Sequence, residues 1–124
     1  MKIMKFGGTS VGKPERMHEV AKLIIKDEES KIVVLSALSG TTNSLVEISN
    51  SLANADRNTA KHQIEALEAH YQNFIGQLIK SKTAIASAKN IITEHFEFLH
   101  IILKISFRCM ATSSLFFHNR SWLP

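Results

Sequence analysis

Short apolar runs and one helical apolar stripe alternate in the first third of the chain. Residues Ile3 to Phe6 and Ile32 to Ala37 are short apolar runs, and the second is rich in β-branched residues and carries no charge. These runs predict two strands, the second buried on both faces. Between them Pro14 suits the first position of a helix, and apolar residues then recur every three or four positions. This stripe consists of Met17, Val20, Ala21, Ile24 and Ile25.

A strand, a helix and a second strand within about 35 residues predict a βαβ unit. Such a unit pairs its strands in parallel through a right-handed crossover, which makes the fold class α/β. The loops that follow the two strands then leave the sheet at the same edge. Ligands of open α/β sheets bind at that edge.

Three further helices are expected after the second strand. The first contains Leu45, Ile48 and Leu52 and is capped by Thr42 or Asn43. The next two carry longer apolar stripes and are expected to pack as an antiparallel helical hairpin, with most of these residues in a core. One stripe is Ile64, Leu67, Tyr71, Phe74, Ile75 and Leu78; the other is Ile91, Ile92, Phe96, Leu99, Ile102 and Leu103.

The segment from Arg108 onward has no helical or strand period, and no acidic residue follows Glu97. The pattern therefore divides the chain into a folded part, residues 1–107, and an unpatterned tail, residues 108–124. A tail of this kind is what a shifted reading frame or a premature stop produces.

Composition narrows the classes of function. A chain of 124 residues with 44% hydrophobic and 21% charged residues predicts one folded domain. The net charge of +4 is spread along the chain, so neither nucleic acid nor a membrane is an expected partner, and no apolar run approaches the ~20 residues of a membrane span. The single Cys109 excludes an internal disulfide and favours a cytoplasmic location, and the six histidines lack the spacing of a metal site.

The motif KFGGTS at residues 5–10 follows the first strand and precedes the helix. Gly7 and Gly8 allow a positive φ or a close backbone approach, and amide groups in such a turn can bind an anion. Lys5 either neutralises phosphate oxygens or is a solvated charge at a strand end. The spacing matches neither a Walker A loop nor the dinucleotide motif. From the residues alone, a phosphate cradle and a structural turn are equally supported.

The second loop, LSGTTNS, surrounds Gly40 with hydroxyl and amide side chains, including Ser36 and Thr42. Any one of these residues is an ordinary turn or cap residue. Two loops rich in Gly, Ser and Thr at one edge of a sheet are the arrangement expected of a site in which one loop binds a phosphate and the other binds a co-substrate.

Together, MKFGGTSVGKPERM and KIVVLSALSGTTNSLVEI closely resemble the amino-terminal segment of the aspartate kinases, over residues 2 to 50. The region up to Phe107 is consistent with that family's helical insertion. The resemblance implies the amino-acid kinase fold, a three-layer α/β/α sandwich. It also implies phosphorylation of the β-carboxylate of L-aspartate by ATP with Mg²⁺, the first step toward lysine, threonine and methionine.

Site roles follow from the same resemblance. Lys5 would stabilise charge on the transferring phosphoryl group, and Gly7 and Gly8 would bring amides against the phosphates. Ser36 would line the same site, and Thr42 would contact aspartate. The nucleotide-contacting segment as a whole would include Phe6, Thr9 and Ser10.

Aspartate kinases also have later segments that hold aspartate and the nucleotide base, and the family pattern ends here near Arg108. The chain is therefore expected to be an amino-terminal fragment that is inactive alone, whereas full-length relatives are expected to be homo-oligomers. Two alternatives stay open: a superfamily kinase acting on glutamate, acetylglutamate or a nucleotide, and a non-catalytic fragment that binds a partner through its helical hairpin.

Overall fold

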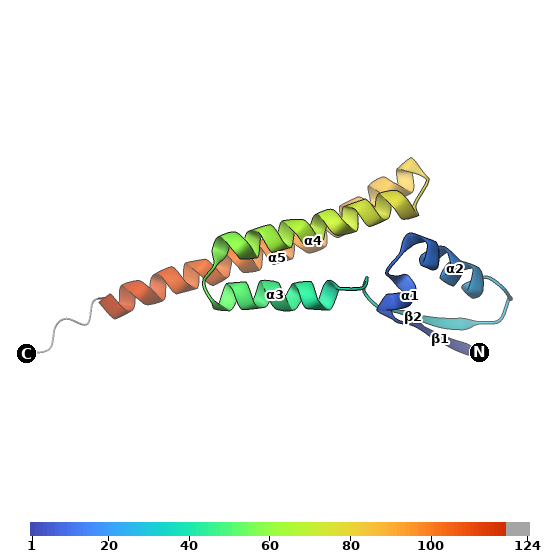
Figure 1. Cartoon of the computed structure of the whole chain (residues 1–124), viewed down its shortest axis with the longest axis horizontal. Helices are drawn as coiled ribbons and strands as arrows, with labels where there is room; N and C mark the ends of the chain where they lie inside the picture. Colours follow the sequence, from blue (N-terminus) through green and yellow to red (C-terminus); the bar gives the residue numbers. More distant parts are fainter. Residues whose placement is uncertain (119–124) are drawn as a thin grey trace, which may run out of the picture.

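The computed structural model describes the backbone of residues 1–118 and the side chains up to Arg108. It is an elongated molecule with a small βαβ unit at one end and three longer helices that extend away from it (Figure 1). The elements are β1 (Lys2–Phe6), α1 (Gly8–Val11), α2 (Pro14–Ile24), β2 (Lys31–Leu35), α3 (Thr41–Ala53), α4 (Arg57–Leu78) and α5 (Lys82–His118).

The βαβ unit confirms the α/β class predicted from the sequence. Strands β1 and β2 pair in parallel, with Lys5 opposite Val34 and Phe6 opposite Leu35. Helix α2 begins with Pro14 at its first position, as expected, and its Val20 is buried. Phe6 lines a cavity together with Val20 and Leu23, so α2 covers the face of the sheet to which Phe6 points.

The opposite face of the sheet is open, which corrects the expectation that the second strand is buried on both sides. Side chains alternate along a strand, so Ile3 and Lys5 share one face with their partners Ile32 and Val34. Ile3 is 70% exposed, and Ile32 and Val34 are each 47% exposed. Among the described residues no helix packs on this face, because α3 leads the chain away from the sheet (Figure 1).

The core lies between the three long helices instead. Helix α4 packs against both α3 and α5, and α4 and α5 lie side by side over most of α4 (Figure 1). Ile64, at the centre, is fully buried. The apolar stripes of the sequence supply this core, whose buried members are Ile48, Ala60, Ile64, Leu67, Phe96 and Leu103.

Two helix ends differ from the sequence expectation. Helix α3 begins at Thr41 and its N-cap is Gly40, two residues before the expected cap Thr42, because Gly40 takes a left-handed φ of 89° that turns the chain into the helix. Helix α5 does not end near Phe107 but continues to His118, into the segment expected to lack a period. Residues 119–124 of that segment lie outside the described part.

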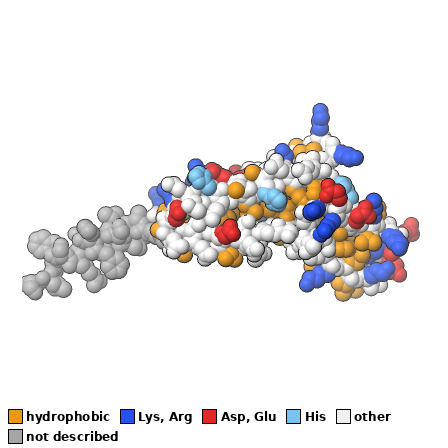
Figure 2. Space-filling view, viewed as in Figure 1, with side chains coloured by type: hydrophobic (Ala, Val, Ile, Leu, Met, Phe, Trp, Pro, Cys, Tyr) orange, Lys and Arg blue, Asp and Glu red, His pale blue; other side chains and the backbone are white. Residues whose placement is uncertain are grey.

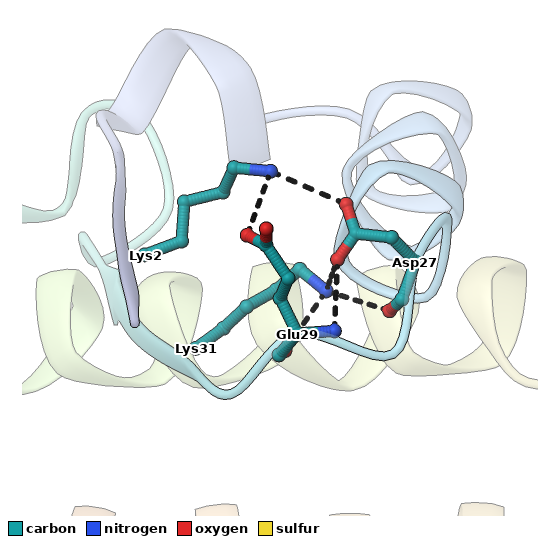
Figure 3. Close-up of polar contacts among 4 residues, drawn as sticks. All are labelled: Lys2, Asp27, Glu29 and Lys31. Carbon is teal, nitrogen blue, oxygen red and sulfur yellow. Dashed lines mark hydrogen bonds and ion pairs between the residues drawn. The ribbon is translucent and has the colours of Figure 1, made fainter.

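Four charged residues close the end of the sheet that is remote from the two loops (Figure 3). The ammonium of Lys31 contacts the Asp27 carboxylate and donates to the backbone oxygens of Asp27 (2.7 Å) and Glu29 (3.2 Å). Lys2 bridges Asp27 and Glu29, at 3.3 Å each. The cluster connects β1 and β2 to the turn after α2. It thereby fixes the point at which the chain returns from α2 to the sheet.

This cluster predicts a stability that depends on pH. The hydrogen bond from Lys31, aided by Lys2, lowers the pKa of Asp27 to about 2. A carboxyl with a lowered pKa stabilises the fold above its unfolded pKa of about 3.9, and the contribution disappears as the pH falls through the folded pKa. Asp27→Asn should therefore lower the melting temperature by a few degrees at pH 6, and the difference should shrink between pH 4 and pH 2.

The matched control is Glu28→Gln, in the same turn. Glu28 is exposed and makes no hydrogen bond or ion pair with any described residue. Thermal melts monitored by circular dichroism should show no comparable pH-dependent difference for this variant. A gap between Asp27→Asn and the parent chain that stays constant down to pH 2 would contradict the role of the charged cluster.

Candidate functional site

The two Gly-rich loops meet at one edge of the sheet, as the parallel pairing requires. The amide of Ser36 donates to the carbonyl of Phe6 at 3.0 Å, which joins the ends of the two strands. A Cβ atom on Gly8 would lie 3.4 Å from the carbonyl oxygen of Ala37, and one on Gly12 would lie 2.8 Å from the Cβ of Ser39. The first loop therefore packs directly on the second, and Gly12 leaves no room for a side chain.

The GGTS segment forms the short helix α1 directly after β1. Gly7 is its N-cap with an extended backbone (φ −79°, ψ 171°), and its carbonyl accepts from the amides of Ser10 (2.9 Å) and Val11 (3.3 Å). Neither Gly7 nor Gly8 has a positive φ. The sequence offered a positive φ or a close backbone approach as the reason for these glycines. Only close approach is observed, and it occurs at Gly8, which the second loop contacts.

Lys5 and the two hydroxyls of the first loop lie on different faces of the sheet. The side chain of Lys5 is exposed on the open face, beside Val34. Thr9 and Ser10 line a cavity of about 340 Å³ on the α2 face, together with Phe6 and Val20. The first loop therefore carries Lys5 and the hydroxyls of Thr9 and Ser10 on opposite sides, and Ser36 adjoins it from the end of β2.

Arg16 is a residue that the sequence reasoning missed. Its guanidinium donates to the carbonyl of Thr9 at 2.8 Å, and its side chain lines the same cavity as Thr9 and Ser10. It therefore holds the first loop against α2 and adds a positive charge beside it. The available signal was its place in the first turn of the predicted helix, from which a long side chain can reach back to the preceding loop.

The second loop is anchored to the helical part of the molecule. The hydroxyl of Thr41 lies 2.8 Å from the hydroxyl of Tyr71 on α4, a contact that the sequence pattern did not reveal. A second cavity, of about 290 Å³, lies between this loop and α4 and is lined by Ser39, Ser44 and Gln63 among others. Ser36 and Thr42 are both exposed near the strand end and the helix start, respectively.

Basic and acidic side chains both lie near the first loop. Lys5, Lys13 and Arg16 surround the first loop, whereas Glu19 is the acidic residue that lines its cavity. In the space-filling view, basic, acidic and hydrophobic side chains are interspersed over this end of the molecule (Figure 2). Among the described side chains, those of residues 1–108, no three His, Cys, Asp or Glu side chains gather in a way that would hold a metal ion.

Comparison with known proteins extends these observations. Residues 1–97 match the model of the amino acid kinase family. The chloroplastic aspartokinase 2 of Arabidopsis thaliana is 36% identical over 104 residues, which are 82% of this chain but 18% of that protein. The bifunctional aspartokinase/homoserine dehydrogenase of Haemophilus influenzae is 44% identical over 73 residues, 57% of this chain and 9% of that enzyme.

A third relative, also from Haemophilus influenzae, is named as an inactive aspartokinase 3. It is 42% identical over 57 residues, which are 46% of this chain and 47% of that protein. The chain thus spans less than a fifth of the Arabidopsis relative and about half of this shorter one, over the matched residues. The family model matches residues 1–97, which include the parallel βαβ unit, and the chain therefore belongs to the amino acid kinase family.

Proposed function

We propose that this chain carries the phosphate-binding and part of the aspartate-binding surface of an aspartate kinase, which transfers the γ-phosphoryl group of ATP to the β-carboxylate of L-aspartate. The observation that carries the proposal is the direct packing of the KFGGTS loop on the LSGTTNS loop at one edge of a parallel sheet. Matches to several aspartokinases support the choice of substrate within the family.

The proposed roles follow the chemistry of phosphoryl transfer. The attacking group is the substrate's own carboxylate, so the protein needs to position the reactants and neutralise charge rather than supply a nucleophile. The first amides of α1, at Gly8 and Thr9, precede the residues that bond within the helix and are available to phosphate oxygens. Lys5 supplies an exposed positive charge, and Arg16 keeps the loop in place through Thr9.

The second loop is proposed to face the amino acid substrate. Ser36 directly follows β2 and its amide is bonded to Phe6, so its hydroxyl stays close to the phosphate loop. Thr42, in the first turn of α3, is exposed and can reach a polar ligand in front of both loops. The bond between Thr41 and Tyr71 fixes the start of α3 and thereby positions Thr42.

Magnesium would enter with the nucleotide, where it neutralises phosphate charge. The described residues do not fit a metal site of their own, because no group of carboxylates converges on the two loops. The proposed roles of Lys5, Arg16 and the loop amides are therefore to bind and orient phosphate and to neutralise its charge, and none of them is to hold the metal ion.

The open face of the sheet supports the expected three-layer architecture. Ile3, Ile32 and Val34 form an apolar surface opposite α2, and a second layer of helices would cover it in the α/β/α sandwich. Lys5 lies on this same face, so the second layer would also enclose its ammonium group. We accordingly expect the 124-residue chain by itself to bind phosphate weakly and to be inactive.

The proposal is tested by titrating the isotopically labelled chain with ATP while recording amide resonances. Millimolar ATP should shift the amides of Gly7, Gly8, Thr9 and Ser36, since these groups adjoin the proposed phosphate position. The Lys5→Ala variant should weaken this response several-fold. Lys2→Ala, which removes the same charge at the other end of β1, is the matched control and should leave the ATP response unchanged.

Two outcomes would contradict the proposed site. One is a set of shifts confined to α4 and α5, which would move nucleotide binding away from the loops. The other is a response of the loop amides that Lys5→Ala and Lys2→Ala weaken equally, because a general charge effect and not a phosphate cradle would then explain the binding.

A further inference from the structure

A positively charged cavity lies between the start of α4 and the carboxyl-terminal half of α5. Its volume is about 340 Å³, and among the described residues it is lined by Arg57, Lys104, Phe107 and Arg108. Three of these four lining residues are cations, and none is acidic. The family model matches residues 1–97, whereas the three lining residues of α5 follow that segment, so the family match assigns no role to this cavity.

The two helices contribute their cations in different ways. On α5, Phe107 and Arg108 come three and four residues after Lys104, so the three side chains lie on one face of the helix. Arg57 is the first residue of α4. Its guanidinium carbon lies over the Phe107 ring, 5.7 Å from the ring centroid. Because a cation is attracted to the face of an aromatic ring, this contact holds Arg57 at the cavity.

The Phe107 ring and the turn before α4 are both fixed by the rest of the molecule. The ring is half-buried and packs against the hydrophobic core. The amide of Asp56 donates to the carbonyl of Ser51 at 2.9 Å, and the Asp56 carboxylate accepts from the amide of Thr59 at 3.0 Å. These bonds set the direction in which the chain enters α4. The ring and the base of the Arg57 side chain are therefore held in place before a ligand binds.

The positive charge of the cavity has little compensation. Among the described residues, the side chains of Arg57 and Lys104 form no hydrogen bond or ion pair. The acidic neighbour of Arg57 is Asp56, whose carboxylate already caps α4. Glu97 lies seven residues before Lys104, about 10 Å along the helix, and no Asp or Glu follows it in the sequence. The tail therefore has no acidic side chain with which to neutralise these two cations.

The chemistry of the cavity fits an anion with several phosphate oxygens. Arginine pairs with phosphate through two parallel hydrogen bonds, and lysine adds a point charge. Since Arg57 and Lys104 come from different helices, a ligand must present oxygens on more than one side to contact both. A carboxylate carries two oxygens on one carbon, whereas a di- or triphosphate spreads its oxygens over a longer span. The volume of the cavity lies at the lower end of the range for small-molecule sites, which suits a ligand of this size.

We propose that the cavity formed by Arg57, Lys104 and Phe107 binds a small soluble polyphosphate, with both cations in contact with phosphate oxygens. Phe107 forms an apolar wall and orients the guanidinium, while Arg108 has an interaction of its own and contributes only its charge. A few charge-assisted hydrogen bonds at an exposed site support a dissociation constant of about 0.1–1 mM for pyrophosphate. Helix α4 begins at the end of α3 that is remote from the sheet, so this site is separate from the KFGGTS loop and independent of the kinase function (Figure 1).

The proposal is tested by titrating the isotopically labelled 124-residue chain with pyrophosphate at constant ionic strength while recording amide resonances. The amides of Arg57, Lys104 and Phe107 should shift along one saturable curve. Lys104→Gln and Arg57→Gln should each weaken binding at least about fivefold, because each removes a charged contact with phosphate. Lys82→Gln, which removes the same charge at the start of α5, is the matched control and should leave the affinity unchanged.

A further variant separates the arrangement of the cavity from its total charge. Phe107→Leu keeps an apolar side chain against the core but removes the ring that holds Arg57. The net charge stays the same, yet pyrophosphate affinity should fall about threefold, because the ligand must then order the guanidinium itself. Lys5→Ala, which alters the separate KFGGTS loop, should leave the shifts on α4 and α5 unchanged. Thermal melts confirm that each variant remains folded.

Several results would overturn the proposal. Pyrophosphate shifts confined to the KFGGTS loop would place phosphate binding there alone. Equal losses for Lys82→Gln and Lys104→Gln, or an equal response to chloride at the same ionic strength, would show that net charge and not the cavity attracts the anion. Binding to phosphatidylglycerol vesicles that Lys104→Gln abolishes, without any response to pyrophosphate, would assign the cations to a lipid surface instead.

Discussion

Replacing Lys5 by Ala in an active kinase should lower kcat for aspartyl phosphate formation by about 10² to 10³-fold, with a far smaller change in stability. Lys5 makes no hydrogen bond or ion pair with any described residue, so its removal breaks no polar contact within this part of the enzyme. A cation that neutralises the transferring phosphoryl group acts mainly in the transition state. Its loss should therefore appear in kcat more than in the melting temperature.

A suitable enzyme for this measurement is a chimera of the bifunctional aspartokinase/homoserine dehydrogenase of Haemophilus influenzae, in which residues 1–53 of this chain replace the matching segment. Its homoserine dehydrogenase activity serves as an internal control for intact protein. Lys2→Ala is the matched variant, because Lys2 lies on the same strand but in the ion-pair cluster at the far end. Near-normal kinase turnover in Lys5→Ala would remove Lys5 from the site.

Replacing Ile64 by Ala should destabilise the 124-residue chain by about 2–5 kcal/mol. Ile64 is fully buried at the centre of the core that α3, α4 and α5 share, so truncation removes apolar contacts and leaves a cavity. A loss of this size is a large part of the free energy of unfolding of an ordinary domain. The variant should melt far below the parent chain or fail to show a cooperative transition.

The control for Ile64 is the same truncation at Ile25, which is 78% exposed at the end of α2. Its free energy of unfolding should change by no more than about 0.5 kcal/mol. Urea denaturation followed by circular dichroism at 222 nm measures both variants. Equal losses for the two substitutions would show that the helical core described here does not govern the stability of the chain.

Much of the fold could be predicted from the hydrophobic pattern because the pattern is local. Short apolar runs located β1 and β2, a stripe with a period of three to four residues located α2, and the stripes containing Ile64 and Phe96 located the two long helices that build the core. The burial of β2 could not be predicted in the same way. The side chains of an apolar strand such as IVVL could be buried on both faces of a sheet. Whether a layer covers each face depends on parts of the fold that are distant in sequence.

The candidate site was predictable to a different extent for each residue. Parallel pairing alone implied that the KFGGTS and LSGTTNS loops adjoin, and the bond between Ser36 and Phe6 confirms it. The side of the sheet on which Lys5 lies depends on which face α2 covers, and the motif does not contain that information. Arg16 and Tyr71 were missed because each reaches the loops from a separate helix, through contacts that no local spacing indicates. The functions assigned to Lys5, Gly7, Gly8, Ser36 and Thr42 stay predictions.

The most direct test of the proposed function is the substrate choice of the unmodified chimera, measured as ATP-dependent formation of acyl hydroxamate from aspartate, glutamate and acetylglutamate. Aspartate should be the preferred acceptor by at least about tenfold in kcat/KM, because the loops of this chain would contribute to both substrate sites. The chimera must first show normal homoserine dehydrogenase activity and melt like its parent enzyme. If such a chimera phosphorylated glutamate preferentially, or no amino acid at all, the proposed aspartate kinase function would be contradicted.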